Sequence, residues 1–276
     1  MQLTLGSTSL DLCRPRVMGI LNVTPDSFSD GGRFVDRDQA LRHAVAMAEA
    51  GAAIIDVGGE STRPGATPVS AQQQIERVVP VIEAVCAHAD VPVSVDTGRP
   101  EVMRAAVAAG ATMINDVYAL RLEGALGAAA SLDVPVCLMH MQGMPGSMQE
   151  DPRYDDVVGE VLEFLRQRVR DCEAAGIPRQ RLLADPGFGF GKTDRHNLEL
   201  LNKLERFTSL GVPLLVGLSR KRTLARLTGR GLDRRESAGI AAAVLAAERG
   251  ASIIRTHDVA ATVDALAIAE AVSRAG

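Results

Sequence analysis

A short motif recurs four times along the chain, in which a glycine ends a helical stretch and an apolar run begins three residues later. The copies are Gly51 before Ile54-Ile55-Asp56, Gly110 before Met113-Ile114-Asn115, Gly211 before Leu214-Leu215-Val216 and Gly250 before Ile253-Ile254-Arg255. Glycine adopts the left-handed conformation that closes a helix, so each copy predicts a helix, a tight turn and a buried strand. The repeat therefore favours an alternating α/β fold.

Eight apolar runs have strand character, and helical patterns lie between them. The runs cover residues 17–21, 53–57, 92–95, 112–114, 134–139, 182–184, 213–217 and 252–255. Strands that alternate with helices form a parallel sheet joined by right-handed crossovers. With no linker dividing the chain, we predict one α/β domain over residues 1–276, a single (β/α)8 TIM barrel. A doubly wound open sheet stays as the alternative, because spacing alone does not prove closure.

The helical patterns can be placed more closely in two segments. Residues 38–50 carry apolar side chains on one side, and the next helix opens at Ser70 with Gln73 three positions on, which is a capping box. Between the fifth and sixth strands, an irregular Met/Gly/Pro-rich stretch precedes a helix that starts near Asp155. This connection and those at 24–38 and 58–69 are long, and all follow strands, so they belong to the face that carries barrel active sites.

Composition limits the classes of partner and compartment. A net charge of −4 argues against nucleic-acid binding, which needs a basic face. The chain shows neither a signal peptide nor an apolar run of about 18 residues, so we expect a cytoplasmic protein that does not enter a membrane. Its four cysteines show no CxxC or metal spacing and are expected to be free thiols.

Polar residues follow almost every predicted strand. They are Asn22, Asp56, Asp96, Asn115, Asp116, His140, Asp185, Ser219-Arg220-Lys221 and Arg255 with His257 and Asp258. Taken singly, each could be a turn former or a helix cap, and Asp116 and Asp258 are assigned no other role. Together they predict a barrel active site, because the carboxyl ends of the strands meet on one face.

The strand-end residues divide by charge into two groups. Asp96, Asp185 and Asn115 could bind a flat heterocycle, because carboxylates accept hydrogen bonds from paired N–H donors. Lys221, Arg255 and His257 could hold a phosphate or diphosphate, with Asn22 near a metal ion on the same anion.

The segment from Gly187 to Thr193 looks like a phosphate-binding loop without being one. The Walker A motif requires glycine at position 186, where this chain has Pro186, and the dinucleotide-binding spacing is also absent. We interpret it as a flexible loop that borders the active site, with Phe188 or Phe190 as an apolar wall.

The same segments resemble the dihydropteroate synthase family along essentially the whole chain. Eight stretches carry the resemblance: residues 22–32, 56–65, 94–97, 114–117, 138–141, 185–192, 219–221 and 255–258. Members of that family condense 6-hydroxymethyl-7,8-dihydropterin diphosphate with 4-aminobenzoate, which releases diphosphate and forms dihydropteroate in folate biosynthesis. The resemblance therefore implies a transferase with two small-molecule substrates, Mg2+ as its cofactor, and a homodimer.

The resemblance also implies roles for individual residues. Asp96, Asn115, Asp185 and Lys221 would bind the pterin, with Lys221, Arg255 and Asp185 as the catalytic set. Arg255 would lie against the pterin ring and help to hold the phosphates with His257. Thr256 would bind substrate, and Thr62 would touch the diphosphate. Arg63, Pro64 and Phe190 would border the substrates, and Asn22 and Asp30 would be the metal ligands. The loops at residues 28–32 and 61–65 would close over the site.

Three points are left open. His140 is interpreted as a structural residue rather than a base. Arg222 stands where many relatives carry a small hydroxyl residue that meets the aminobenzoate carboxylate. Arg222 followed by Thr223 could still serve, through a salt bridge or through amides at the N-terminus of the next helix, or it could change inhibitor sensitivity. The alternatives in function are a pterin-binding methyltransferase, a Schiff-base aldolase that uses Lys221, and a non-catalytic pterin-binding homologue.

Overall fold

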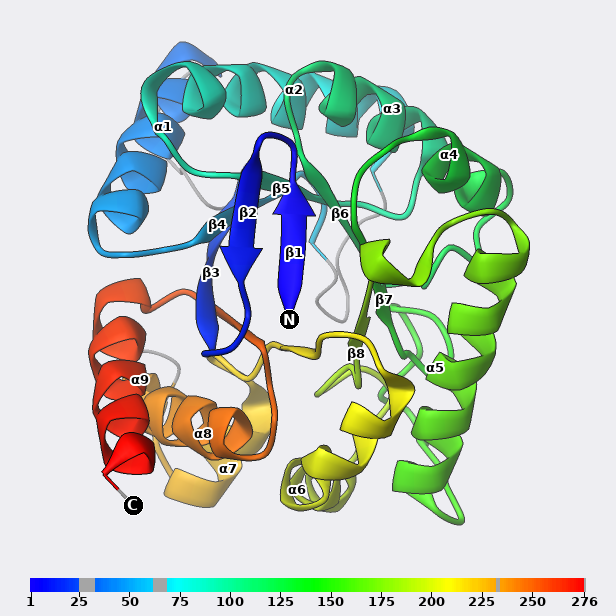
Figure 1. Ribbon diagram of the computed structural model, residues 1–276, viewed down its shortest axis with the longest axis vertical. Coiled ribbons are helices and arrows are strands. Elements are labelled where there is room, and N and C mark those ends of the chain that lie inside the picture. Colours follow the sequence, from blue (N-terminus) through cyan, green and yellow to red (C-terminus); the bar gives the residue numbers. More distant parts are fainter. Residues whose placement is uncertain (25–32, 62–68, 232–233, 276) are drawn as a thin grey trace.

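Eight parallel strands form a ring in the computed structural model, which describes residues 1–24, 33–61, 69–231 and 234–275 (Figure 1). The strands are β3 (Arg16–Asn22), β4 (Ile54–Gly58), β5 (Val93–Asp96), β6 (Met113–Asp116), β7 (Val136–Met139), β8 (Leu182–Asp185), β9 (Leu215–Val216) and β10 (Ile253–Thr256). All eight predicted strands are confirmed, with ends that differ by at most two residues.

The order of the strands shows that the sheet is a barrel. Each strand from β3 to β8 pairs with the next in sequence, β10 pairs with both β3 and β9, and Ala184 of β8 bridges to Leu214 just before β9. A doubly wound sheet would reverse direction at one strand and leave two separated edges. The alternative of an open sheet is therefore wrong.

Helices lie outside the strands and cover them from all sides. They are α1 (Arg33–Glu49), α2 (Ala71–His88), α3 (Pro100–Ala108), α4 (Ala125–Ser131), α5 (Val157–Ala174), α6 (Asp194–Asn202), α7 (Arg222–Thr228), α8 (Glu236–Glu248) and α9 (Val259–Arg274), with short 3-10 helices η2 (Arg179–Arg181) and η3 (Leu204–Leu210). Helix α1 starts five residues before the predicted position, and α5 starts two residues after its own.

Local signals in the sequence account for how these helices begin and end. Ser70 caps α2 with the predicted capping box, in which its side chain accepts from the backbone N–H of Gln73. The four repeat glycines all have positive φ, from +68° at Gly211 to +111° at Gly110, so the interpretation of the repeat is confirmed. A residue with a Cβ would be strained at these positions, because the left-handed region is costly for other residues.

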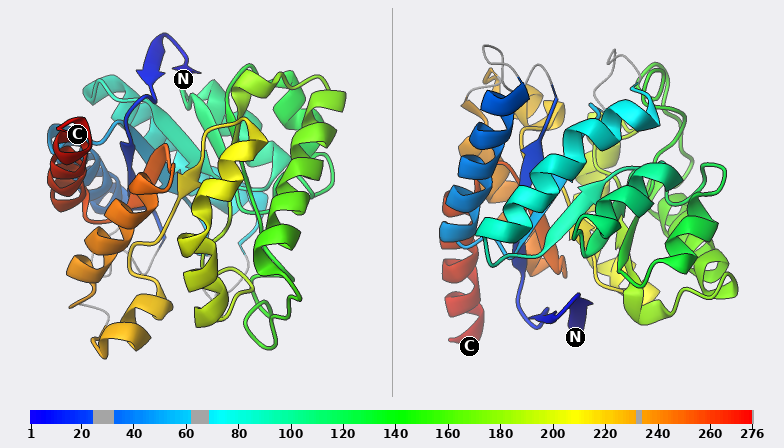
Figure 2. Two further views of the ribbon diagram at one scale, coloured as in Figure 1. Left: turned by 60° about the horizontal axis from the view of Figure 1, so that its bottom comes forward. Right: turned by 90° about the horizontal axis from the view of Figure 1, so that it is seen from above.

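A two-stranded hairpin that the sequence patterns did not indicate closes one end of the barrel. Its strands are β1 (Gln2–Leu5) and β2 (Thr8–Asp11), and it lies across the centre of the ring in Figure 1 and at one end of the molecule in Figure 2. Leu3 and Leu5 are almost fully buried. They pack with inward-facing side chains of the strands, which are Met18, Ile54, Met113, Cys137, Leu183, Leu215 and Ile253.

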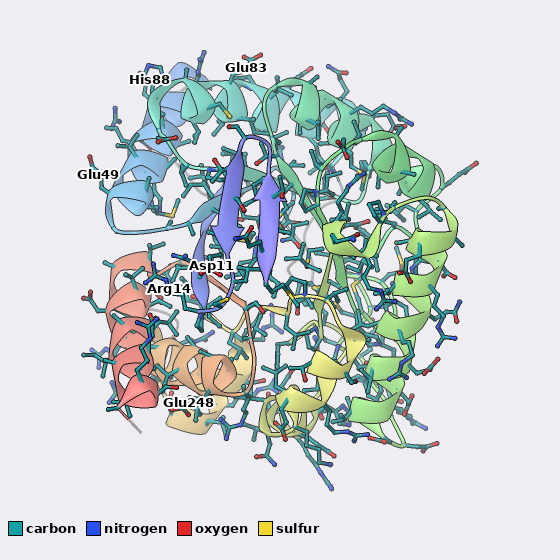
Figure 3. All side chains as sticks on the ribbon, viewed as in Figure 1. Asp11, Arg14, Glu49, Glu83, His88 and Glu248 are labelled. Atoms are coloured by element: carbon teal, nitrogen blue, oxygen red, sulfur yellow. The ribbon has the colours of Figure 1, made fainter. Side chains whose placement is uncertain are left out.

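The hairpin lies at the end of the barrel opposite the candidate site. In Figure 3, the labelled Glu49, His88 and Glu248 are the last residues of α1, α2 and α8, and they surround the hairpin end. Helices that finish there begin at the other end, where the strands also finish. The carboxyl ends of the strands therefore face away from the hairpin.

Two further expectations can be compared with the described part of the chain. Cys13, Cys86, Cys137 and Cys172 are all free thiols, as predicted. Among the helices of the described residues, none combines the length and the apolar character needed to cross a bilayer.

Candidate active site

Asn22, Asp96 and Asn115 lie in one layer at the carboxyl ends of neighbouring strands. Asn22 of β3 pairs with Gly58 of β4, Gly58 pairs with Asp96 of β5, and Asp96 pairs with Asn115 of β6. A Cβ at Gly58 would meet Oδ1 of Asn22 at 3.5 Å and Cβ of Asp96 at 3.6 Å. The glycine therefore keeps open the space between the predicted metal ligand and the predicted pterin ligand.

Arg255 connects two carboxylates in the centre of the site. It projects from β10, and its Nε donates to Oδ2 of Asp56 at 2.6 Å while its Nη2 donates to Oδ2 of Asp96 at 2.8 Å. The sequence analysis grouped Arg255 with the basic residues by charge and, from the family resemblance, also placed it against the pterin ring. Its two ion pairs show that Arg255 joins the basic residues to the carboxylates.

Asp56 is the site residue to which sequence reasoning gave no role. Its side chain is fully buried, and its Oδ2 accepts from Nδ2 of Asn115 at 3.0 Å as well as from Arg255. The signal that could have identified it is its position, which is two residues before the strand-end layer and on the same strand face. A buried carboxylate there needs a cationic partner, and the several N–H donors of a guanidinium suit it to pair with two carboxylates at once.

Burial and neighbouring charges shift the pKa values of Asp96 and Arg255. It raises the pKa of Asp96 to about 7, although the charge of Arg255 acts in the opposite direction. Burial alone would lower the pKa of Arg255, but the carboxylates of Asp56 and Asp96 outweigh it and raise that pKa. Arg255 therefore stays charged, and its positive charge favours the ionised form of the buried carboxyl groups beside it.

Asp185 and Lys221 lie on the other side of the site. Asp185 ends β8, and its Oδ1 accepts from the backbone N–H of Gly187 at 2.7 Å. Lys221 precedes α7, and its Nζ lies 4.3 Å from the ring centre of Phe190. Burial raises the pKa of Asp185 to about 6 and lowers that of Lys221 to about 8, while the charge of each partly offsets the shift of the other.

His257 is held by Ser219, which follows β9. The Oγ of Ser219 lies 3.0 Å from Nδ1 of His257 and accepts from the backbone N–H of His257 at 3.2 Å. Next to it, Nη2 of Arg220 forms an ion pair with Asp258 at 2.6 Å. The predicted basic residues from the last two strands are therefore brought together, and Asp258 serves to pair with Arg220 rather than to cap α9 with its side chain.

The side chain of Thr256 points in a different direction from that of its neighbour Arg255. Successive side chains of a strand point to opposite faces, so Thr256 points outward where Arg255 points into the barrel. Its Oγ1 accepts from the backbone N–H of Asp258 at 3.1 Å and lies 3.3 Å from Oγ1 of Thr262 on α9. The hydroxyl of Thr256 is therefore buried between β10 and α9, and its side chain points away from the site.

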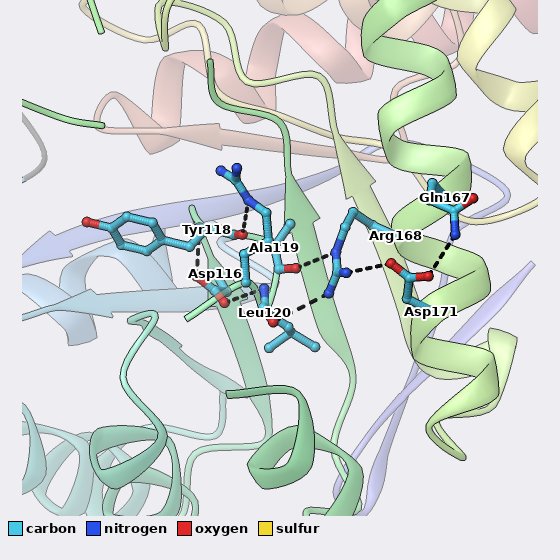
Figure 4. Close-up of polar contacts among 8 residues, drawn as sticks. Asp116, Tyr118, Ala119, Leu120, Gln167, Arg168 and Asp171 are labelled. Carbon is cyan, nitrogen blue, oxygen red and sulfur yellow. Dashed lines mark hydrogen bonds and ion pairs between the residues drawn. The ribbon is translucent and has the colours of Figure 1, made fainter. Parts of the chain in front are cut away.

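Asp116 is a turn residue, as the sequence analysis assigned it. Figure 4 shows its carboxylate accepting from the backbone N–H groups of Tyr118 and Leu120, both at 2.7 Å. Arg168 of α5 secures the same turn by donating to the carbonyl of Ala119 at 2.8 Å, and it is paired with Asp171. Asp116 is thus engaged by its own loop, next to the site without facing it.

His140 is buried and makes no contact suited to a base. Its ring lies edge-on to Phe164, with 4.8 Å between ring centres, and its Nδ1 lies 2.9 Å from Nζ of Lys192. Burial and the charge of Lys192 lower the pKa of His140 to about 2. A neutral imidazole of such low basicity supports the structural interpretation.

The loop from Gly187 to Gly191, which the sequence analysis interpreted as a flexible border of the site, is held by several hydrogen bonds. Lys192 donates to the carbonyls of Gly187 and Phe190 within the same loop. Phe188 is 1% exposed and packs into the main core, so it forms no wall of the site. Phe190, which contacts Lys221, is the aromatic residue of the loop that borders the site.

Arg222 and Thr223 differ in their exposure and in their hydrogen bonds. The hydroxyl of Thr223 donates to Oδ1 of Asp194 at 2.7 Å and accepts from Nδ2 of Asn197 at 3.2 Å. Thr223 is buried, whereas Arg222 is exposed at the start of α7. Only Arg222 therefore presents its polar group to a ligand in solution.

Four predicted site residues cannot be placed. Asp30, Thr62, Arg63 and Pro64 lie outside the described residues, as do the loops at 28–32 and 62–65. Among the described residues, no group of three or more His, Cys, Asp or Glu side chains could hold a metal ion. Asn22 supplies one amide oxygen, which suits a Mg2+ ion that takes its other ligands from water and phosphate.

A parallel barrel with buried carboxylates, a guanidinium and a lysine at the carboxyl ends of its strands defines a barrel enzyme. Comparison with known proteins agrees with this class. The family model described as "Pterin binding enzyme" matches residues 18–257. The chain belongs to this pterin-binding family, and within it to the dihydropteroate synthases.

The relatives support this membership over the full length. The dihydropteroate synthase of Escherichia coli strain K12 is 53% identical over 271 residues, which cover 98% of this chain and 96% of the relative. A structure of Xanthomonas albilineans dihydropteroate synthase with 4-aminobenzoic acid has a TM-score of 0.94 at 56% identity, covering 99% and 98% of the two chains. A Yersinia pestis dihydropteroate synthase in a sulfonamide drug complex has a TM-score of 0.95 at 51% identity, covering 99% and 100%.

Proposed function

We propose that this enzyme condenses 6-hydroxymethyl-7,8-dihydropterin diphosphate with 4-aminobenzoate, forming 7,8-dihydropteroate and diphosphate for folate biosynthesis. The observation that carries the proposal is Arg255, which is held between Asp56 and Asp96 and is flanked along the chain by His257. This places a permanent positive charge beside the carboxylates that would bind a heterocycle. Family membership supports the same reaction.

Asp96, Asn115 and Asp185 would bind the pterin. A pterin presents adjacent N–H donors and ring acceptors along one edge, which carboxylates and a carboxamide can pair with in one plane. Asp185 has Oδ1 occupied by Gly187, and Oδ2 is free to accept from the ring. Lys221 would donate to an acceptor of the pterin, and its position against Phe190 fixes the direction of its ammonium group.

The diphosphate would lie toward Arg255 and His257. Mg2+, held through Asn22, would neutralise charge on the diphosphate when bound, and Asp30 is the second candidate ligand. His257 is oriented by Ser219, so its ring nitrogen Nε2 can face an anion. Thr62 and Arg63 would add contacts from the loop after β4. A clamp of this kind stabilises negative charge as it develops on the leaving group.

The chemical step requires that the two substrates are correctly oriented, and it does not require a strong general base. The C–O bond between the pterin methylene and the diphosphate breaks, and its electron pair leaves with the diphosphate. The dihydropterin ring delocalises the positive charge left on the methylene carbon. The amine nitrogen of 4-aminobenzoate then attacks that carbon and releases a proton to solvent. The low basicity of His140 is compatible with this step, because a neutral amine already carries the required lone pair.

The aminobenzoate would lie between Phe190 and the start of α7, with Pro64 as a further wall. Its carboxylate would meet the guanidinium of Arg222, because the hydroxyl of Thr223 is engaged by Asp194 and Asn197. An exposed ion pair contributes about 1 kcal/mol or less, so this contact would adjust affinity rather than create it.

The test is a turnover assay with purified enzyme, the dihydropterin diphosphate, 4-aminobenzoate and Mg2+. We expect diphosphate and dihydropteroate to appear in equal amounts. Folded protein that releases no diphosphate would contradict the proposal and favour a non-catalytic pterin-binding protein. A methyltransferase would instead transfer a methyl group to a corrinoid, and an aldolase would be labelled at Lys221 by borohydride with a carbonyl substrate.

We also propose that the enzyme is a cytoplasmic homodimer that pairs through α8 and α9. These neighbouring helices expose large apolar side chains, Leu245 at 41%, Ile268 at 68% and Val272 at 69%. Exposed apolar side chains on adjacent elements are typical of subunit contacts. Light scattering should give twice the monomer mass, and Ile268→Glu with Val272→Glu should give the monomer. A wild-type monomer would contradict the proposal.

A further inference from the structure

Lys192 is a buried lysine to which the proposed reaction assigns no role. Its side chain folds back into the loop from Gly187 to Gly191, and the residue is 3% exposed. Nζ donates to the carbonyls of Gly187 at 2.9 Å and Phe190 at 3.0 Å, and it lies 2.9 Å from Nδ1 of His140. The three donors of the ammonium group are therefore matched by three close acceptors.

The same loop is held from a second direction. Nε2 of Gln149 donates to the carbonyl of Gly189, and Oη of Tyr154 donates to the carbonyl of Gly191 at 2.8 Å. Four of the five carbonyl groups of the loop thus accept hydrogen bonds from side chains. Lys192 is the residue that makes two of these bonds and so draws the loop inward.

The loop contacts two residues that would bind the pterin. The backbone N–H of Gly187 orients the carboxylate of Asp185, and the ring of Phe190 lies against the ammonium group of Lys221. Gly189 has a φ of +76°, and a Cβ there would lie 3.2 Å from Cδ of Lys221. The shape of the loop therefore decides where both charged groups point.

We propose that Lys192 is a positioning residue for catalysis, which holds the loop from Gly187 to Gly191 so that Asp185 and Phe190 face the two substrates. The proposal rests on the proposed function. The ammonium group of Lys192 donates to the carbonyl oxygens of Gly187 and Phe190, which would repel each other without it. Without it the loop relaxes outward, Gly187 turns away from Asp185, and Phe190 withdraws from Lys221.

The proposal also gives His140 a defined part. When Lys192 is charged, its ammonium group only donates, so we assign Nδ1 of His140 as the acceptor and place the imidazole proton on Nε2. The neutral imidazole thus serves as the third acceptor for Lys192. Burial lowers the pKa of Lys192 to about 7, and the carboxylate of Asp185 acts against that shift. Two charged groups act on the ammonium group of Lys192. Asp185 favours its charged form, and Lys221 disfavours it.

The experiment compares Lys192→Met with Lys203→Met. Methionine keeps the length of the side chain and removes the donors, and Lys203 is a partly exposed lysine paired with Glu199 on α6. For Lys192→Met we expect kcat to fall at least about tenfold and the KM for 4-aminobenzoate to rise, because misplacement of reacting groups by about 1 Å has such effects. Lys203→Met should match the wild type.

Two further measurements keep a structural effect apart from a positioning effect. Circular dichroism gives the folded fraction, and calorimetry gives the Kd of 6-hydroxymethyl-7,8-dihydropterin without diphosphate, which should rise in Lys192→Met. Tyr154→Phe removes one hydroxyl group that bonds to the loop and should change kcat and KM in the same direction by a smaller factor. If Lys192→Met does not fold, the kinetics of Tyr154→Phe decide whether the loop positions the substrate-binding residues.

The outcomes separate this proposal from the proposed function. Wild-type turnover tests the function, whereas the variants are compared with an active wild type. If Lys192→Met is folded and keeps the wild-type kcat, KM and Kd, the positioning role is overturned. It is also overturned if activity falls only in proportion to the folded fraction, with KM and Kd unchanged.

Discussion

The Nε of Arg255 donates to Oδ2 of Asp56 at 2.6 Å, from β10 to β4 over the one intervening strand β3. Removal of one partner from a buried ion pair leaves a charge with no compensation, although Arg255 also keeps Asp96. We expect Asp56→Asn to lower the free energy of unfolding by about 1–3 kcal/mol and to reduce turnover. Urea denaturation measures the first effect. Asp133→Asn is the control, since Asp133 is an exposed partner of Arg181 and its change should be near zero.

Arg255, Lys221 and His140 should differ sharply in their importance for turnover. Arg255→Ala and Lys221→Ala remove charges that face the substrates, and each should lower kcat/KM by about 100-fold or more. His140→Ala should cost much less, because His140 faces Lys192 behind the loop and touches no substrate. Steady-state kinetics on folded variants measures the difference. Equal losses in all three would overturn the role assigned to His140.

Pterin binding should be strongest between about pH 7 and pH 8. Burial raises the pKa of Asp96 to about 7 and that of Asp185 to about 6, so as the pH falls below these values the two carboxylates are protonated in turn and lose acceptor strength. Burial lowers the pKa of Lys221 to about 8, so above that pH the ammonium group is lost. Calorimetry with 6-hydroxymethyl-7,8-dihydropterin from pH 5 to pH 9 should show a bell-shaped affinity. Lys221→Met should remove the decline at high pH, and a wild-type affinity independent of pH would contradict the assignment.

The requirement for Mg2+ should depend on Asn22. Asn22→Ala removes an amide oxygen beside Gly58 and should raise the Mg2+ concentration that gives half of the maximal rate. Binding of the pterin without diphosphate should stay unchanged, because that ligand carries no anion for the metal. Full activity of the wild type in excess chelator would show that the proposed cofactor is not needed.

Arg222 should distinguish charged from uncharged arylamines. We expect Arg222→Ser to raise the KM for 4-aminobenzoate up to about fivefold, the size of an exposed ion pair. The KM for 4-aminobenzamide, which lacks the carboxylate, should not change. Equal shifts for both arylamines would indicate that Arg222 acts through the shape of the site and not through its charge.

The barrel itself could be predicted from local patterns. Apolar runs, capping residues and the recurring glycines act over a few residues. They place the ends of all eight strands within two residues, whereas α1 starts five residues before its predicted position. The hairpin was missed because β1 and β2 are only four residues each and two of their buried leucines face a ring that forms from distant strands. A local pattern of that length contains no information on what it will cover.

The candidate site could be predicted in its residues and less well in its contacts. Strand-end position identified Asp96, Asn115, Asp185, Lys221 and Arg255, because the strands of a barrel finish on one face. The side chain of Thr256 points away from the site, because side chains alternate along a strand and that of its neighbour Arg255 points inward. The bridge from Arg255 to Asp56 and Asp96 joins segments about 200 and 159 residues apart, and such pairing follows from the closed ring alone.

The hairpin under the barrel has a practical consequence for handling the enzyme. Met1 lies at the end of the molecule that the substrates do not use, and the first strand is anchored there by Leu3 and Leu5. A peptide fused ahead of Met1 would attach this enzyme to a bead or a sensor chip with its working face toward the liquid. The carboxyl ends of the strands would then face the substrate solution in every immobilised molecule.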